Sequence, residues 1–324
     1  MINKKLMIKI STSLVITIGF IIFALNKIMW NDFFTVINSF QFIYIAPAMF
    51  FVMMMHFIHS LRWNLFLRNE VSNFKLIYFV ITNVSFMINS LVPFRLGDVA
   101  KIYLAKNNVN TKISKLTSTV IIGHYFDAIF LFLFLNISLL LIKLDFREFF
   151  QSDFIYYILL LINLIIILSM IFVKQITKFL SYNLIKIPYL SKLTFLVDTL
   201  NIEINLITRN INNLILTLFL TFSYWGCLVL IFKFVSIGIG LDLSVEILIL
   251  AVVLSSFAIS IPVTPTSLGT FHLAVVYSMS FLMDNQALLF TYSLILHTII
   301  MISIISYGSI SFIWIQFRNS KLNI

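Results

Sequence analysis

Four ionisable side chains lie in pairs inside long apolar stretches of this 324-residue chain, and they are its first candidates for chemistry. Arg95 and Asp98 are three residues apart, as are His124 and Asp127, a spacing that places two side chains on one face of a helix. An unpaired charge within a bilayer costs on the order of 3 kcal/mol, so ionisable residues at such positions are functional candidates by default. His272, close to a second interruption of the apolar pattern, joins them.

These residue types are more typical of a binding site for a charged ligand than of a catalytic site. The guanidinium of Arg95, together with backbone N–H groups at helix starts, could hold an anionic group such as a lipid phosphate. Carboxylates and imidazoles could tune that charge or accept a cationic headgroup, and an imidazole changes protonation near neutral pH. We therefore predict that these side chains bind substrate: Arg95, Asp98, His124, Asp127 and His272.

Structural interpretations of the same residues stay open. Arg95 and Asp98 could form an ion pair that only holds the chain together, and His124 and Asp127 could form a hydrogen-bonded pair between helices. His297 alone is more often a core histidine than a ligand. Three further side chains approach the end of one apolar stretch, where we expect them at the membrane interface: His56, His59 and Arg62.

Catalytic and metal-binding signatures were sought in the sequence and are missing. The chain has no His-Glu-x-x-His, Gly-x-Ser-x-Gly, P-loop, Gly-x-Gly-x-x-Gly or Asp-x-Asp pattern. His56-x-x-His59 has the nearest metal-ligand spacing, but it lacks a third ligand. We therefore expect no metal, no cofactor and no enzymatic activity.

The composition requires elements that lie in a membrane. Apolar residues make up 61% of the chain and charged residues 10%, compared with about 45–50% and about 25% in soluble domains. This predicts an all-α polytopic integral membrane protein and excludes soluble enzymes, disordered chains and disulfide scaffolds. The net charge of +10 comes without basic runs interleaved with aromatics, so we expect no nucleic acid partner. The single cysteine, Cys227, lies in an apolar run and is expected to pack there.

Six apolar runs are long enough to cross about 30 Å of hydrocarbon. They cover residues 10–29, 42–61, 117–142, 154–173, 211–236 and 287–315. The first follows a basic N-terminus, exceeds a typical signal-peptide core and lacks a cleavage site, so we interpret it as a retained span. Two further regions, 76–104 and 244–283, are interrupted by Pro and Gly at Pro93, Gly97, Pro265 and Gly269.

The distribution of Lys and Arg decides how the interrupted regions cross. If both turn back inside the bilayer, 17 basic residues lie inside and four outside: Lys27, Lys143, Arg147 and Lys233. If each crosses once, the two sides are nearly equal. The positive-inside rule prefers the first arrangement, which gives six full spans, two re-entrant hairpins and cytoplasmic termini.

The two interruptions share the pattern Pro-x-x-Leu-Gly, at Pro93–Gly97 and Pro265–Gly269. One lies in each half of the chain, and the two are entered from opposite sides of the membrane. This layout indicates an inverted repeat whose broken helices form a midplane site. We predict one domain over residues 1–324, with halves of about 1–143 and 154–324 and a cytoplasmic interfacial segment over about 174–210.

The order of these motifs resembles that of the lysylphosphatidylglycerol synthase transmembrane-region family. Leu61-Arg-Trp-Asn-Leu65 and the run from Asn89 to Leu104 are similar to its Arg-Trp and Pro-Gly-Arg-x-Gly-(Asp/Glu)-x-x-Arg signatures. Ser114–Asp127, Ser223-Tyr-Trp225 and Ile261–His272 resemble later signatures in the same order. Matched residue by residue, Arg95, Gly97, Asp98 and Lys101 correspond to the first Pro/Gly signature, and Pro265 and Gly269 to the last. The resemblance thereby adds Lys101 to the predicted substrate-binding residues.

The resemblance implies a flippase-like membrane protein without the aminoacyltransferase domain that is fused to well-understood members. Several positions depart from the family pattern. Phe94 and the Thr266-Ser267 pair replace glycines, His124-Tyr125 replaces Glu-Arg, and His272 replaces a Glu. Losing acidic residues while gaining histidines indicates a different substrate or a different coupling chemistry.

The function expected from the sequence is translocation of an anionic or headgroup-modified lipid, an anionic phospholipid or a polyprenyl-phosphate lipid, at a midplane cavity in the cytoplasmic (inner) membrane. Two alternatives stay open. One is a membrane component of a lipid aminoacyl- or glycosyl-transfer system, and the other is an accessory subunit of envelope biosynthesis. A transferase activity would need a partner chain. Besides membrane lipids, the partners considered are a second copy in a homo-oligomer and an envelope-synthesis protein.

Overall fold

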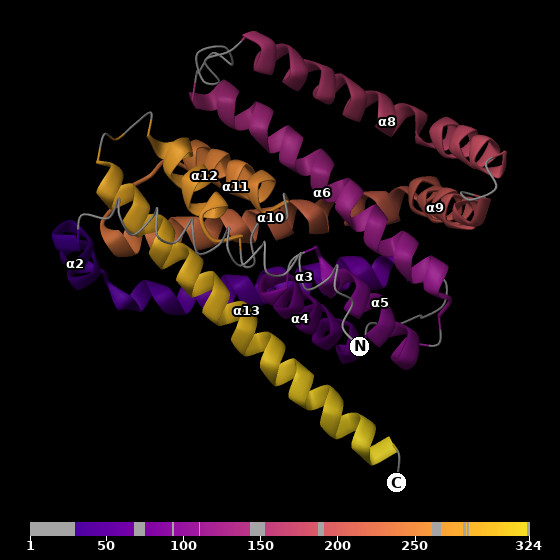
Figure 1. Ribbon diagram of the computed structural model, residues 1–324, viewed down its shortest axis with the longest axis horizontal. Coiled ribbons are helices and arrows are strands. Elements are labelled where there is room, and N and C mark those ends of the chain that lie inside the picture. The colour runs from indigo at the N-terminus through magenta and orange to yellow at the C-terminus, as the bar shows by residue number, and fades with distance from the viewer. Residues whose placement is uncertain are drawn as a thin grey trace, which may run out of the picture. The chain divides into compact units, whose positions relative to one another are not determined.

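The computed structural model describes residues 30–67, 75–92, 94–109, 111–142, 153–186, 191–260, 267–280, 283 and 285–322. Within these ranges the regular structure is helical and no strand occurs (Figure 1). The predicted all-α class is confirmed. The first predicted span, 10–29, and two motif prolines, Pro93 and Pro265, lie outside the described residues.

Four of the described helices are long and apolar enough to cross a membrane. They coincide with four of the predicted spans: α3 (Ile45–Phe66, preceded by the 3-10 turn η1, Phe42–Tyr44), α6 (Ile113–Ile142), α10 (Ile211–Ile239) and α13 (Gln286–Leu322). Their near-continuous Ile, Leu and Phe content suits helices that contact lipid on one side and protein on the other. The chain is a polytopic membrane protein.

Helices α8 and α9 cover the predicted fourth span and the segment that follows it. Helix α8 runs from Asp153 to Ile185, with a kink at Phe172 (φ −106°, ψ 15°), which lies where the predicted span ends. Helix α9 (Ser191–Arg209) packs against both α8 and α6. Helices in the 174–210 segment were predicted and are present. Their position along the cytoplasmic interface stays a prediction.

Each interrupted region forms two short helices. The first gives α4 (Leu76–Leu91) and α5 (Leu96–Val109), and the second gives α11 (Val245–Ser260) and α12 (Thr270–Met279). They contain 16, 14, 16 and 10 residues, and a membrane-spanning helix needs about 20. Helices α11 and α12 pack side by side (Figure 1), so this region folds back as a hairpin.

The helices form two compact units. Unit 1 comprises residues 1–56, 80–100 and 225–324, and unit 2 comprises 57–79 and 101–224. Both interruptions of the apolar pattern belong to unit 1. Helices α6, α8 and α9 belong to unit 2. The single-domain organisation and the inverted repeat stay predictions.

A helix that was not predicted, α2 (Trp30–Ser39), opens the described part of unit 1 and packs on α13. After it, the N–H of Gln41 donates to the carbonyl of Gly238 at the end of α10, at 2.8 Å. Five residues before Gly238 in α10, Lys233 donates from Nζ to Asp242 Oδ1 at 2.8 Å. This hydrogen bond and the charge of Lys233 lower the pKa of the exposed Asp242 carboxyl. The pair suits a polar end of the helix, outside the hydrocarbon.

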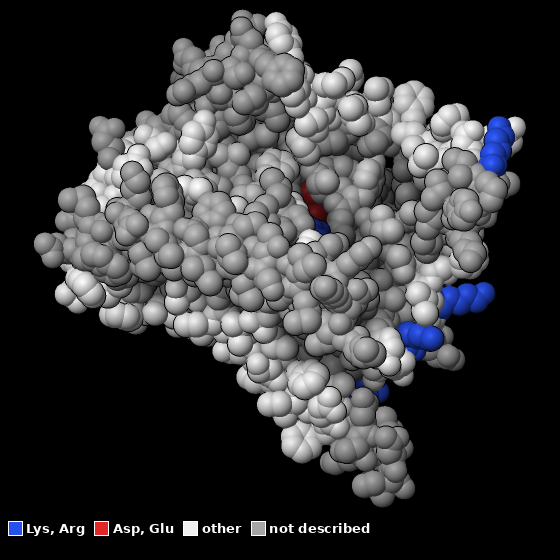
Figure 2. All heavy atoms as spheres, in the orientation of Figure 1, with Lys and Arg blue, Asp and Glu red and all other residues white. Residues whose placement is uncertain are grey.

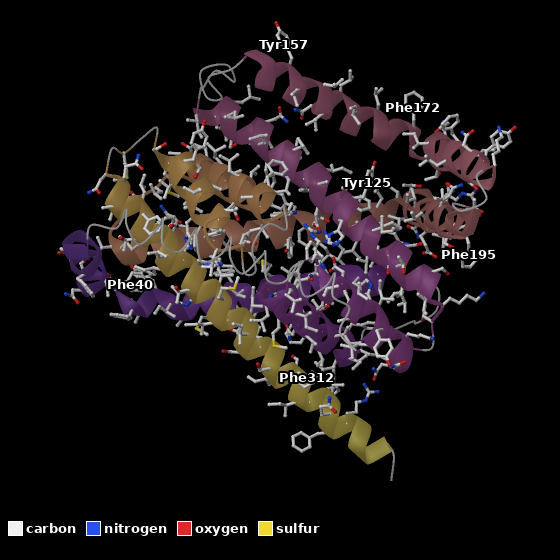
Figure 3. All side chains as sticks on the ribbon, in the orientation of Figure 1. Phe40, Tyr125, Tyr157, Phe172, Phe195 and Phe312 are labelled. Atoms are coloured by element: carbon white, nitrogen blue, oxygen red, sulfur yellow. The ribbon has the colours of Figure 1, made fainter. Side chains whose placement is uncertain are left out.

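The outer faces of the helices are apolar, as lipid contact requires. Figure 2 shows few charged atoms among the described residues on one face of the molecule. Exposed aromatic side chains are common, and Figure 3 labels four of them: Tyr157 and Phe172 on α8, Phe195 on α9 and Phe312 on α13. In water such surfaces would drive aggregation, so their exposure indicates that lipid covers them.

Candidate functional site

The two Pro-x-x-Leu-Gly patterns share an unusual backbone conformation at their third residue. Arg95 has φ 52° and Ser267 has φ 54°, both in the left-handed region that non-glycine residues rarely adopt. Phe94 and Gly269 also have positive φ, at 67° and 89°. Each non-glycine residue in this region costs on the order of 1 kcal/mol and persists only where its surroundings impose it. The two interruptions therefore share this conformation at their third residue, which is Arg95 in the first of them.

The first interruption is held by the side chain of Asn89 on α4. Its Oδ1 accepts a hydrogen bond from the N–H of Gly97 at 2.7 Å, and its Nδ2 donates to Asp98 Oδ1 at 3.1 Å. Ser85 Oγ, one turn earlier, donates to the carbonyl of Gly97 at 2.9 Å. The first turn of α5 therefore lies against the last turns of α4, and the chain turns back here as the charge distribution predicted.

Glycine is required at position 97 because the backbone of α4 comes too close for a side chain. A Cβ there would overlap the carbonyl oxygen of Ser85 and lie 2.6 Å from Asn89 Oδ1. This close approach explains why the pattern ends in glycine in the first interruption. In the second interruption, Gly269 is the residue before α12. Its φ of 89° is one that glycine adopts readily because it has no Cβ.

The side chain of Arg95 connects the two interruptions within unit 1. Its Nη2 donates to Ser260 Oγ at 3.3 Å, and Ser260 is the last residue of α11, directly before the second interruption. Arg95 is exposed, so its guanidinium is accessible from outside the protein. Two segments that lie 165 positions apart in the sequence thus meet at a cationic group.

His272 stands in the first turn of α12, next to the second interruption. It is 3% exposed, and its Nδ1 lies 3.1 Å from Ser293 Oγ on α13. The ring of His297, also on α13, lies 4.9 Å away in an edge-to-face arrangement. A second buried histidine of unit 1, His56, is held differently: its Nδ1 lies 2.7 Å from Asn83 Oδ1.

Unit 2 contains a tight, bidentate ion pair. Arg62 on α3 donates from Nη1 and Nη2 to the two carboxylate oxygens of Asp127 on α6, at 2.6 and 2.9 Å. Arg62 is 1% exposed, also donates to Thr221 Oγ1 at 2.9 Å, and lies over the ring of Tyr224, both on α10. Because its charge is met by a bidentate carboxylate, we interpret Arg62 as a structural link between three helices.

Lys101 is a second buried cation of unit 2. It is 3% exposed, and its Nζ lies 4.2 Å from the ring centroid of Trp63 and 3.5 Å from His59 Nδ1. Trp63 in turn donates from Nε1 to Thr119 Oγ1 at 3.0 Å. The lysine therefore lies against an aromatic face inside the protein.

The structure distributes the predicted site residues over both units. Arg95, Asp98 and His272 belong to unit 1, whereas Lys101, His124 and Asp127 belong to unit 2. Asp98 accepts a hydrogen bond from Asn89, and Asp127 is bound by Arg62, a partner 65 positions earlier that its sequence neighbourhood did not reveal. That each of the six binds substrate stays a prediction.

Four residues with clear roles were missed or interpreted differently. Asn89 and Ser260 are common polar residues at helix ends, and only their place beside the Pro-x-x-Leu-Gly patterns could have marked them. Arg62 and His56 were expected at the membrane interface, which stays a prediction, and their burial against other helices, at 1% and 0% exposed, was not foreseen. Their position near the end of an apolar run does not show which face of the helix they occupy.

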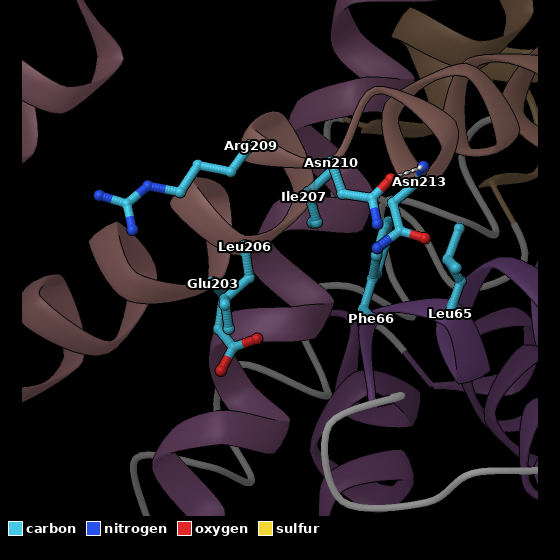
Figure 4. A pocket seen from close by; sticks show the side chains of 8 residues that line it. All are labelled: Leu65, Phe66, Glu203, Leu206, Ile207, Arg209, Asn210 and Asn213. Carbon is cyan, nitrogen blue, oxygen red and sulfur yellow. Dashed lines mark hydrogen bonds between the residues drawn. The ribbon is translucent and has the colours of Figure 1, made fainter.

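A small pocket of about 300 Å³ lies in unit 2 beside α9 (Figure 4). Its polar lining includes Glu203 and the pair Asn210 and Asn213, and in Figure 4 the side chain of Arg209 points away from the Glu203 carboxylate. Lys115 Nζ lies 3.5 Å from Glu203 Oε1. None of the predicted site residues lines this pocket. Across the described ranges, no group of three or more His, Cys, Asp or Glu side chains could hold a metal ion.

Comparison with known proteins identifies the family. The sequence profile of the lysylphosphatidylglycerol synthase TM region matches residues 10–308, which include all described helices of the interrupted regions. The chain belongs to this family. A UPF0104 membrane protein of Methanocaldococcus jannaschii is 30% identical over 225 residues, which is 69% of this chain and 92% of that protein. No solved structure matches the chain.

Membership of the lysylphosphatidylglycerol synthase TM region family agrees with the geometry of the motifs. Its Arg-Trp signature corresponds to Arg62 and Trp63, which bind Asp127 and Thr119 on α6. Its first Pro/Gly signature corresponds to the turn held by Asn89, and its last one to the start of α12. The signatures therefore lie at helix contacts and helix breaks, where polar groups inside a membrane protein must be satisfied.

Proposed function

We propose that this protein moves an anionic lipid, or a lipid with a modified headgroup, between the two leaflets of the cytoplasmic membrane. The observation that carries the proposal is the exposed guanidinium of Arg95 at the junction of the two interruptions, bonded to Ser260 at 3.3 Å. An arginine inside a membrane protein is costly unless it meets polar groups or an anion. In this proposal a phosphate or carboxylate of a lipid headgroup binds at the exposed guanidinium.

The backbone around Arg95 supports anion binding. Helix α5 begins at Leu96 and helix α12 at Thr270, so both interruptions open helices whose N-terminal ends carry partial positive charge. The residue before α12 is Gly269, which has no side chain to cap the first-turn N–H groups. Half-helices that start near the membrane midplane are the usual means by which transporters bind anionic groups.

In this proposal the chain acts as a carrier, not as an enzyme. The headgroup is held at Arg95 while the acyl or polyprenyl chains stay in the hydrocarbon, so the headgroup never crosses apolar lipid unprotected. The exposed apolar helices provide the surface along which such chains could slide. If the chain were only the membrane component of a transferase system, it would bind lipid without exchanging it between leaflets.

Binding can be tested by native mass spectrometry of the protein purified in mild detergent, with phosphatidylglycerol and phosphatidylcholine offered at equal concentration. We expect preferential retention of the anionic lipid. A charge-assisted hydrogen bond is worth about 1.5–3 kcal/mol, so Arg95→Gln should weaken retention about tenfold to a hundredfold.

The matched control is Arg318→Gln in the same unit, because this arginine lies over Trp314 near the end of α13. It should leave retention unchanged. Equal retention of both lipids by the wild type, or equal losses in the two variants, would contradict a headgroup site at Arg95.

A further inference from the structure

The imidazole of His272 is fixed in one tautomer by its neighbours on α13. Ser293 Oγ donates its single hydrogen to the carbonyl of Phe290 at 2.7 Å. The 3.1 Å contact between Ser293 Oγ and His272 Nδ1 therefore needs its hydrogen from the imidazole, so Nδ1 carries the proton. In the neutral ring, Nε2 then has a bare lone pair.

That lone pair is buried and has no hydrogen-bond partner. A buried acceptor without a partner costs about 1–3 kcal/mol, and such an atom in a folded protein calls for an explanation. The nitrogen lies in the first turn of α12, three residues after Gly269 and therefore next to the interruption at which the lipid is proposed to bind. A proton is the ligand that an imidazole lone pair binds most readily.

The surroundings of His272 are apolar and can hold at most one positive charge. The rings in contact with His272 are those of Phe271, Phe290 and His297, and Phe271 also stacks on His297 at 5.0 Å. A second imidazolium 4.9 Å from the first would be strongly disfavoured in this apolar shell. The two imidazoles can therefore share one proton.

Other titratable groups on the helices around His272 are not placed to bind this proton. On α13, the hydroxyl of Tyr292 donates to the carbonyl of Phe232 on α10 at 2.9 Å. Lys233 of α10 is bonded to Asp242. The acidic residue of α11, Glu246, lies in its first turn, roughly 21 Å along the helix from Ser260 at the end that leads to the interruption. On α12 itself, Tyr277 is 43% exposed.

We propose that His272 and His297 form a proton-binding site that takes up one proton with each anionic lipid, so that a proton gradient drives lipid movement. The proton passes from a hydronium ion to Nε2 of His272, forming one N–H bond and releasing water. An imidazolium beside an interruption that holds an anion is stabilised by that anion, so proton and lipid each increase the affinity for the other. This inference rests on the proposed lipid transport.

The test uses the purified protein in phosphatidylcholine vesicles that contain fluorescent phosphatidylglycerol, with and without a difference of one pH unit across the membrane. One proton per lipid at this gradient gives up to about a tenfold enrichment of the lipid in one leaflet. His272→Gln and His297→Gln should abolish the enrichment. The control Tyr277→Phe removes a titratable group from the same helix and should keep it.

The outcomes separate the two proposals. If the lipid exchanges rapidly but distributes equally under the gradient, proton coupling is wrong and lipid transport stands. If the wild type moves no lipid, the transport proposal fails, and nitrogen NMR of the five histidines decides the proton site. His272 should be the Nδ1–H tautomer at pH 7.5 and gain a proton at Nε2 on addition of phosphatidylglycerol; an Nε2–H tautomer, or no response to the lipid, would overturn the inference.

Discussion

Arg62 and Asp127 are joined by two hydrogen bonds of 2.6 and 2.9 Å, although 65 positions separate them in the sequence. The guanidinium is 1% exposed, so removing its carboxylate leaves a buried cation without its counter-ion. Asp127→Asn should lower the free energy of unfolding by about 3–5 kcal/mol, the usual cost of breaking a buried pair. Thermal denaturation in detergent, followed by tryptophan fluorescence, measures this loss.

Two further variants test whether the pair is structural. Asp198→Asn removes an exposed carboxylate of the same unit and should change stability little. Arg62→Met combined with Asp127→Leu removes both charges and should recover much of the lost stability. If the double variant is no more stable than Asp127→Asn, the pair is not the source of the destabilisation.

Gly97 fixes the turn between α4 and α5, and replacing it should disrupt that turn. Gly97→Ala places a methyl group against the backbone carbonyl of Ser85, which cannot move without opening the hairpin. We expect a loss of about 1–3 kcal/mol in stability from this overpacking and a lower yield of folded protein in size-exclusion chromatography.

Gly226→Ala on α10 is the matched control, because a Cβ there meets no atom within 4 Å. Alanine is a better helix former than glycine, so this variant should be neutral or stabilised by up to about 1 kcal/mol. Equal behaviour of the two alanine variants would show that the contact between Gly97 and Ser85 does not constrain the fold.

The predicted topology can be measured with single cysteines in a Cys227→Ala background, since Cys227 is the chain's one cysteine and is buried. Lys106→Cys and Phe195→Cys should react with a membrane-impermeant thiol reagent only after the cells are opened. Asp242→Cys should react in intact cells. Reaction of Lys106→Cys in intact cells, with Asp242→Cys protected until the cells are opened, would contradict a re-entrant hairpin in the first interrupted region.

Much of the helical framework was predictable because hydrophobicity acts over a continuous run of residues. Helices α3, α6, α10 and α13 begin and end within a few residues of the predicted spans, apart from the C-terminal extension of α13. Pro93 and Gly97 indicated the first interruption for reasons that apply in any fold. Proline lacks the N–H that a helix interior needs, and glycine lowers helix stability.

The contacts of the candidate site were harder to predict because they join distant segments. Spacing within one helix suggested His124 as the neighbour of Asp127, but the carboxylate meets Arg62 from another helix. In the same way, the three-residue spacing of Arg95 and Asp98 did not reveal Ser260 or Asn89, whose roles depend on how the hairpins fold back. Side-chain partners across helices need the tertiary structure.

Arg95 donates to Ser260, and Asp98 accepts from Asn89. If Arg95 serves the lipid, Arg95→Gln should stay folded and lose transport, with a much smaller effect on thermal stability. The double variant Arg95→Gln/Asp98→Asn should be folded and still fail to transport lipid. Recovery of transport in the double variant would make Arg95 a structural partner of Asp98.

The central claim is tested most directly by the rate at which fluorescent phosphatidylglycerol leaves the inner leaflet of vesicles that contain the purified protein. We predict a rate well above that of protein-free vesicles for the wild type and for Arg318→Gln, and a rate about tenfold to a hundredfold lower for Arg95→Gln. A wild-type rate equal to the protein-free background over a panel of anionic lipids, or an undiminished rate for Arg95→Gln, would contradict the account.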